Sequence, residues 1–249
     1  MRKKAWGSFF LCFFLFIFLC PSPLQSDFYI KKIHHFSSKS TMEKQTPERE
    51  EQGITWIAKN KLRDDQGKQR TTIIRLDKKK IYIIDHSQKT YSEINLPIDL
   101  EKALSSEAQK MLDMMEVSSS VTDTGETKKI KQWKARKYVV DISATMMEMN
   151  MPIKMEIWST KDTGIDLDVY KKFTDELLSI NPFTKNLVKE FKKIEGYPVL
   201  THTSMKMMGS EMITREEVIS VEKKEAPSGT YQLPQGYKKT EYNPLQQKR

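Results

Sequence analysis

Methionine is the residue type whose spacing points most directly to a chemical role in this chain. The 249-residue sequence contains 14 methionines, and many of them lie in two segments, 146–155 and 205–212. From 147 to 157 every odd position is apolar and most even positions are polar. The apolar set is Met147, Met149, Met151, Ile153, Met155 and Ile157. Because side chains alternate between the faces of a strand, this pattern predicts a strand with one buried, methionine-rich face.

Three roles fit such a face. Methionine is flexible and polarizable, so a wall built from it can adapt to ligands of different shape, including acyl chains. The same side chains can also fill a solid core beneath helices. The third role is thioether ligation of copper(I). We rank copper last, because the alternation with Ile153 and Ile157 is typical of packing and no histidine or cysteine cluster accompanies the methionines.

The other reactive residue types form no catalytic or metal-binding motif. His34 and His35 are adjacent and therefore point to opposite faces of a strand. Asp64-Asp65 and the acidic pair in 166–168 fall where a turn and a helix start are expected, positions at which aspartate is common for structural reasons. The sequence contains no glycine-flanked serine, no phosphate-binding glycine loop and no zinc-protease motif. We therefore expect a protein that is not an enzyme and uses no metal or cofactor.

The first 26 residues have the features of a cleavable export signal. Three basic residues at 2–4 precede an apolar run from Phe9 to Leu19 that is short for a membrane span. Cleavage after Ser26 removes both cysteines, Cys12 and Cys20, and leaves a mature chain without thiols. An uncleaved anchor and lipidation at Cys20 are the alternatives. We expect the protein in the periplasm or at the outer-membrane periphery of a Gram-negative-type bacterium.

Charge and length narrow the partners and the domain organisation. The net charge is +9, with basic and acidic residues interleaved, which favours mild attraction to an anionic membrane surface. Export and the lack of a clustered basic patch argue against nucleic acid. We expect a single domain over residues 27–240, followed by a tail at 241–249.

Hydrophobic periodicity predicts an antiparallel meander with inserted helices. Short strands with polar turns are expected at 71–76, 81–85 and 90–96, and a terminal hairpin at 197–207 and 211–223. A helix is expected over 97–117, where apolar residues recur at helical spacing: Leu100, Leu104, Met111 and Met115. A second helical region spans 167–194 and is interrupted at Pro182. The polar segment 37–51 is expected to be a loop or a frayed hairpin, and the charged segment 122–130 is expected to be a turn.

An ordered series of short motifs resembles the bacterial domain-of-unknown-function family 4412. The likeness covers about residues 28–240, and its motifs are Ala58–Arg63, the hairpin from Leu76 to Glu93, Glu156–Lys161, Gly196–Leu200 with Met205–Gly209, and Gln232–Lys239. That family is similar, more distantly, to the lipoprotein carrier and acceptor LolA and LolB. The resemblance implies an α+β fold, a curved, half-open antiparallel β-barrel whose concave face is covered by helices.

These expectations converge on a non-enzymatic envelope protein that binds a hydrophobic ligand, a lipid or lipoprotein acyl chains, between sheet and helices. The expected cavity wall is the odd-numbered set from Met147 to Ile157, with Leu104, Met111 and Met115 on the covering helix. A structural or protein-interaction module with a solid core is the first alternative, and a methionine-rich copper(I)-binding protein is the second.

Overall fold

The computed structural model describes residues 26–40, 46–97, 99, 110, 114–146, 149–180, 187–207 and 209–242. The expected export signal at 1–26 therefore lies almost entirely outside the described residues. Within them, no helix combines the length and the apolar character needed to cross a membrane.

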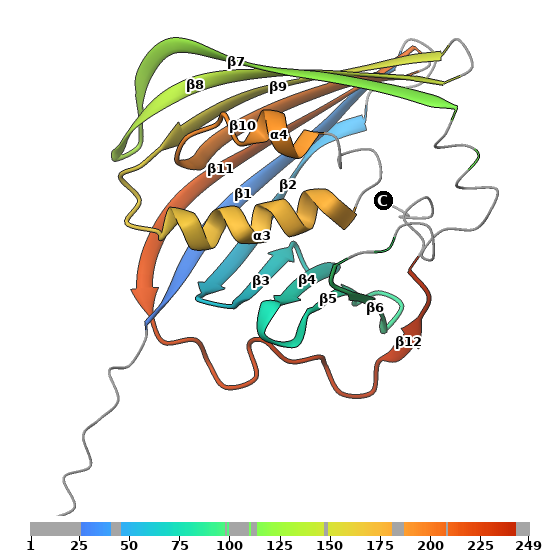
Figure 1. The fold of residues 1–249 in the computed structure, drawn as a ribbon, viewed down its shortest axis with the longest axis vertical. Helices are drawn as coiled ribbons and strands as arrows, with labels where there is room; N and C mark the ends of the chain where they lie inside the picture. Colours follow the sequence, from blue (N-terminus) through green and yellow to red (C-terminus); the bar gives the residue numbers. More distant parts are fainter. Residues whose placement is uncertain are drawn as a thin grey trace, which may run out of the picture.

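One 12-stranded sheet forms the body of the protein (Figure 1). Its strands, in chain order, are β1 (Asp27–Ser40), β2 (Thr46–Ala58), β3 (Lys61–Gln66), β4 (Arg70–Arg75), β5 (Lys80–Asp85), β6 (Thr90–Asn95), β7 (Met115–Ile130), β8 (Trp133–Met146), β9 (Met149–Thr160), β10 (Tyr197–Met207), β11 (Ser210–Lys224) and β12 (Lys238–Thr240). The order across the sheet is β12-β6-β5-β4-β3-β2-β1-β11-β10-β9-β8-β7. Neighbouring strands are antiparallel except β12 and β6, which are parallel.

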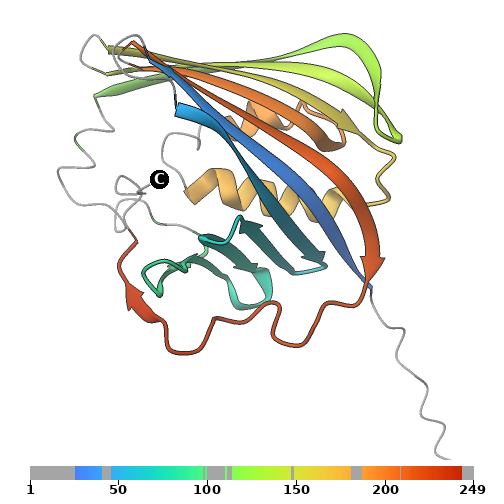
Figure 2. The ribbon, with the colours of Figure 1, turned by 180° about the vertical axis from the view of Figure 1, so that it is seen from behind.

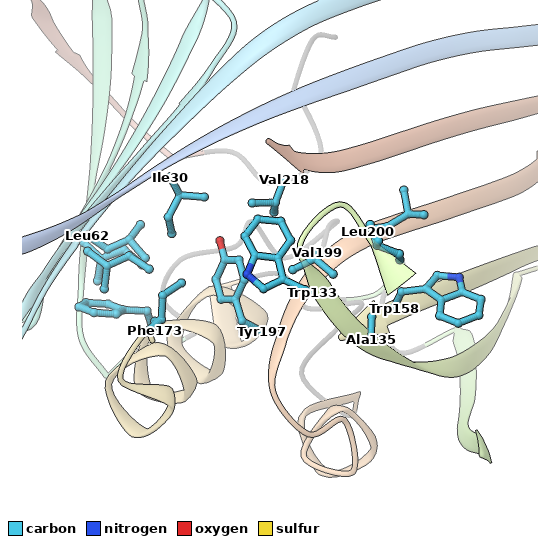
Figure 3. Close-up of a cluster of buried hydrophobic side chains, with 14 of the residues drawn as sticks. Ile30, Leu62, Trp133, Ala135, Trp158, Phe173, Tyr197, Val199, Leu200 and Val218 are labelled. Atoms are coloured by element: carbon cyan, nitrogen blue, oxygen red, sulfur yellow. The ribbon is translucent and has the colours of Figure 1, made fainter. Parts of the chain in front are cut away.

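Two helices in the described part of the chain, α3 (Leu167–Ile180) and α4 (Val188–Phe191), pack on one face of this sheet, which we call the helix face (Figure 1). A 3-10 turn, η1 (Leu76–Lys78), joins β4 to β5. Figure 3 shows Phe173 pointing from α3 toward Leu62 of β3, with Tyr197 beside it. Phe173 is fully buried in the larger of two apolar clusters, which also contains Ile30, Ile57 and Ile74. The core therefore lies mainly between α3 and the sheet.

The fold is mostly β, and the expected antiparallel sheet with helices is confirmed at that level. The sheet is not closed or strongly curled, so the expected half-open barrel is wrong in that respect. The long strands β7–β11, β1 and β2 and the short strands β3–β6 form one continuous sheet with β7 and β12 as its edge strands. Among the described strands, these two edges do not pair with each other.

One segment that we expected to be a turn is a strand, and the frayed hairpin considered for 37–51 is confirmed where the structure describes it. Residues 37–40 and 46–51 belong to the long antiparallel pair β1–β2, in which His35 Nδ1 lies 3.3 Å from Glu48 Oε1. Residues 122–130 belong to β7, which begins at Met115, so the end of the expected 97–117 helix is strand as well. Both segments are polar on both sides, and cross-strand hydrogen bonds and ion pairs hold them where apolar alternation is absent.

The C-terminal segment covers the other face of β3–β6. Figures 1 and 2 both show it on the side of these strands away from α3. Arg63 Nη1 donates a hydrogen bond to the Thr230 carbonyl at 3.1 Å, and Arg75 Nη1 donates one to the Tyr231 carbonyl at 3.1 Å. Ile73, which pairs with Arg63 across β3 and β4, is fully buried. The pairing of β12 with β6 anchors the end of this segment.

Candidate functional site

A pocket of about 640 Å³ lies between the helix face of the sheet and the two helices. Strands β1, β2, β3, β9, β10 and β11 contribute its floor, and α3 and α4 contribute its cover. Its apolar lining comprises Phe36, Ile57, Leu62, Met155, Ile157, Phe173, Leu177, Leu178, Phe191 and Ile194. A volume of about 300–1,000 Å³ is typical of small-molecule sites. The pocket is thus large enough to hold a ligand of ordinary size.

The methionine-rich strand supplies one wall of this pocket. Met155 and Ile157 line it, and Ile153 packs with Met155 against a buried cluster that includes Leu187 and Ile194. Met151 is partly buried and opposes the buried Ala144 across β8 and β9. The even positions that follow face the opposite side of the sheet. Pro152 and Lys154 are exposed, whereas Met151, Ile153 and Met155 are partly buried and only Ile157 is fully buried. The alternation is therefore present, but the expected buried face is only partly covered.

The remaining expected wall residues do not join this site. Met147, Leu104 and Met111 lie outside the described residues, and Met149 is described only as the first residue of β9. Met115 was expected on a covering helix but is the first residue of β7, opposite Met146 of β8. Helix α3, through Phe173 and Leu177, takes the covering place that the 97–117 segment was expected to fill.

Four charged or titratable side chains lie inside the same pocket, and we call them the Lys32 cluster: Lys32, His34, Asp64 and Glu216. Lys32 Nζ is 3.5 Å from Asp64 Oδ1 and 3.2 Å from Glu216 Oε1. His34 Nδ1 is 3.3 Å from Glu216 Oε2. The Lys32 side chain is only 11% exposed. An ammonium so far from water needs such partners, because an isolated buried charge is strongly disfavoured.

Neighbouring polar groups complete the cluster. Thr55 Oγ1 donates a hydrogen bond to Asp64 Oδ1 at 2.5 Å, and Gln66 Nε2 donates one to Asp64 Oδ2 at 3.3 Å. The rings of Tyr170 on α3 and Tyr197 on β10 lie against each other, with centroids 4.7 Å apart. Both tyrosines line the pocket. The polar end of the pocket is therefore built from strands β1, β2, β3 and β11 together with these two rings.

Burial and pairing set the protonation states of the cluster. Burial alone lowers the pKa of Lys32, but the attraction of Glu216 and other acidic neighbours outweighs it and places the pKa well above the usual value. Burial raises the pKa of Asp64, yet Lys32 and the hydrogen bond from Thr55 reverse this and lower it. Burial, assisted by Lys32, lowers the pKa of His34 despite Glu216. At neutral pH Lys32 and Asp64 are therefore charged and His34 is neutral.

Sequence reasoning missed this cluster for a specific reason. We expected Asp64 and Asp65 in a turn, but both lie in β3, where Asp64 shares the helix face with Leu62 and Gln66. Alternation along β1 puts Ile30, Lys32 and His34 on that same face. On this face Lys32 lies between Ile30 and His34, and the sequence alone suggests that its side chain faces solvent. Only the pairing of β1 with β2 and β11 reveals its carboxylate partners.

A second hollow of about 930 Å³ lies on the opposite face of β7–β11. Its lining is mostly polar and includes Ser118, Ser120, Ser143, Ser204, Asp141, Lys154, Glu156 and His202. Trp158 lies at its edge, but Lys128 Nζ sits 3.9 Å from the ring centroid and the indole is 3% exposed. This hollow is larger than the pocket beneath the helices, but polar residues outnumber the apolar ones in its lining, which are Ile142, Pro152, Ile153, Trp158 and Ile213.

Among the described residues, no three histidine, cysteine, aspartate or glutamate side chains come together as metal ligands. Met155 alternates with Ile153 and Ile157 along β9, as a packed face would. The copper(I) alternative stays a prediction, and the geometry of the described residues adds nothing in its favour.

Replacing His34 with glutamine should make the stability of the protein less dependent on pH between 7 and 5. The unfolded chain binds a proton at a histidine of ordinary pKa, about 6.5, whereas folded His34 binds one only at lower pH. Unfolding therefore becomes easier as the pH falls from about 6.5 through the folded pKa. Denaturant titrations at each pH measure the slope, and NMR of the histidine ring gives its midpoint. An unchanged slope in His34→Gln would contradict this expectation.

The chain is similar to a described protein family over most of its length. Residues 36–237 match the family model described as Domain of unknown function (DUF4412). Among curated proteins, none matches the chain. The match lies inside the span over which the sequence motifs resemble that family, and it gives no support to the more distant likeness to LolA and LolB.

Proposed function

The chain belongs to the DUF4412 family, and from this premise and the pocket geometry we propose that it is a non-enzymatic, exported envelope protein that holds a hydrophobic ligand. The ligand class is a lipid or the acyl chains of a lipoprotein, and its place is the pocket between the helix face and helices α3 and α4. One observation carries the proposal: a pocket of about 640 Å³ beneath the helices, with Met155 and Ile157 of β9 in its lining.

Burial of apolar surface is the proposed source of affinity. Each methylene that moves from water into an apolar site contributes about 0.8 kcal/mol. Met155 and Phe191, both in the lining, are only partly buried, so each has surface left to cover. Methionine tolerates chains of different shape because its side chain is unbranched and flexible. The chain has a net charge of +9, or +6 without the three basic residues at 2–4 of the expected leader, and this charge would bring it toward anionic membranes.

Filling the pocket should abolish binding while leaving the fold intact. In Met155→Trp the larger side chain occupies the space beside Ile157, so binding of the neutral hydrophobic dye Nile red should weaken by about tenfold or more. Dye fluorescence during titration measures the affinity. Native mass spectrometry of the protein purified from cells would identify ligands that copurify.

The matched control is Met207→Trp. Met207 is 42% exposed, lies on β10 and is absent from the lining of both hollows, so this variant should bind the dye as the wild type does. A wild-type protein that carries no ligand and binds no dye would sink the proposal and would instead fit an interaction module with a solid core.

A further inference from the structure

The proposed pocket has a charged end and an apolar end. The Lys32 cluster occupies strands β1, β3 and β11, whereas Met155 and Ile157 lie on β9. In the sheet, β9 is separated from β1 by β10 and β11. At a strand spacing of about 4.8 Å, the step from Lys32 to the β9 wall is about 14 Å. A ligand that fills the pocket must therefore present different chemistry at its two ends.

The charged end carries an excess of negative charge. Asp64 and Glu216 are two carboxylates that share one ammonium, that of Lys32. His34 does not balance them, because burial keeps its imidazole neutral at pH 7. Most other charged side chains of the lining have partners of their own: Lys192 pairs with Asp175, and Arg215 with Glu217.

The last two charges of the lining do not change this balance. Glu51 pairs with Arg49, and Lys171 is exposed on α3, where solvent screens its charge. The four side chains of the Lys32 cluster therefore carry one more negative than positive charge in a partly buried site, while Arg215 and Lys131 share the carboxylate of Glu217. A ligand cation beside Asp64 and Glu216 would balance the excess of the cluster, since buried charges are stable only when paired.

We infer that the preferred ligand is an amphiphile with an ammonium head group, which lies against Asp64 and Glu216 while its chain extends along Met155 and Ile157. This inference rests on the proposed function and specifies its ligand class. Carboxylate oxygens accept hydrogen bonds from an ammonium, and such charge-assisted bonds are the strong ones. An anionic head group would meet two carboxylates and a lysine that is already paired with both.

Displacement of Nile red from the full-length protein by three ten-carbon amphiphiles tests the head group. Decylamine, decanol and decanoate share one chain and differ in charge at pH 7. Decylammonium should displace the dye at a concentration about tenfold or more below that of decanoate, with decanol between them. All three are used below the concentration at which they form micelles.

Two variants test whether the preference for the ammonium head group comes from the Lys32 cluster. Glu216→Gln and Asp64→Asn each remove one negative charge from the cluster, and each should reduce the preference for decylammonium over decanoate by about tenfold. Glu222→Gln is the matched control, because Glu222 lies on the same strand as Glu216 but is exposed and outside the pocket lining. Displacement by decanol should be unchanged in all three variants and shows that the pocket is intact.

The outcomes separate this inference from the proposed function. If the wild type binds decanol but shows no preference for decylammonium, or prefers decanoate, the head-group inference is overturned and the proposed function stands. If neither the dye nor any of the three amphiphiles binds, the proposed function fails and the inference fails with it. If one variant does not fold, the other variant and the wild-type ranking still decide the result.

Discussion

Replacing Phe173 with alanine should lower the free energy of unfolding by about 3–5 kcal/mol, the usual cost of removing a fully buried phenylalanine ring. Phe173 is 0% exposed and is the residue through which α3 enters the larger core cluster. The cavity left behind would lie between α3 and Leu62, next to the pocket. Chemical denaturation followed by circular dichroism measures the change, and the variant should also bind Nile red less tightly because α3 covers the pocket.

Phe36→Ala is the matched control for this substitution. Phe36 is on β1, 40% exposed, at the pocket lining, so the loss of its ring should cost about 1 kcal/mol or less. Equal losses in the two variants would mean that α3 does not pack on the sheet as described.

Replacing Lys32 with methionine should lower the free energy of unfolding by about 3 kcal/mol, because removal of one partner from a buried ion pair leaves the other charge uncompensated. Methionine matches the length of the lysine stem, so the loss reports charge more than packing. Asp64 and Glu216, which are 20% and 35% exposed, would then repel each other across an apolar pocket. Breaking a buried ion pair costs about 3–5 kcal/mol, and we expect the lower value here because Glu216 retains partial contact with water.

Lys31→Met provides the control one residue away. Lys31 is exposed on the other face of β1, where its Nζ lies 5.7 Å from the Tyr29 ring centroid, and its loss should cost less than about 1 kcal/mol. In the Lys32→Met background, Asp64→Asn should recover part of the lost stability. A destabilisation that Asp64→Asn leaves unchanged would show that the charge of Asp64 is not its cause.

The pattern of β9 could be predicted from the sequence because it is local. Two-residue periodicity over 147–157 follows from the geometry of any strand with one buried face, and the structure has Met155 and Ile157 on that face. The same reasoning gave the strands at 71–76, 81–85 and 90–96 to within a residue or so, and the terminal hairpin that turns at Gly209, where φ is +77°.

Elements without apolar alternation were predicted poorly. The polar residues of 122–130 form a strand because the neighbouring strand β8 supplies their hydrogen bonds, and that neighbour is not visible in the local sequence. In β7 the edge is also shielded, since the Val121 amide donates a hydrogen bond to Glu190 Oε2 of α4 at 2.9 Å. Polar strands of this kind depend on tertiary contacts more than on their own composition.

Alternation along a strand is a property of neighbouring residues, so the local pattern was enough to predict an antiparallel sheet and the side of β9 that carries Met155 and Ile157. The covering by α3, the open sheet and the position of Lys32 between Asp64 and Glu216 come from long-range packing, which no local pattern records. The reason is physical: a buried charge is stabilised by partners from other strands, and the register that joins β1, β3 and β11 is set by the packing of the whole sheet.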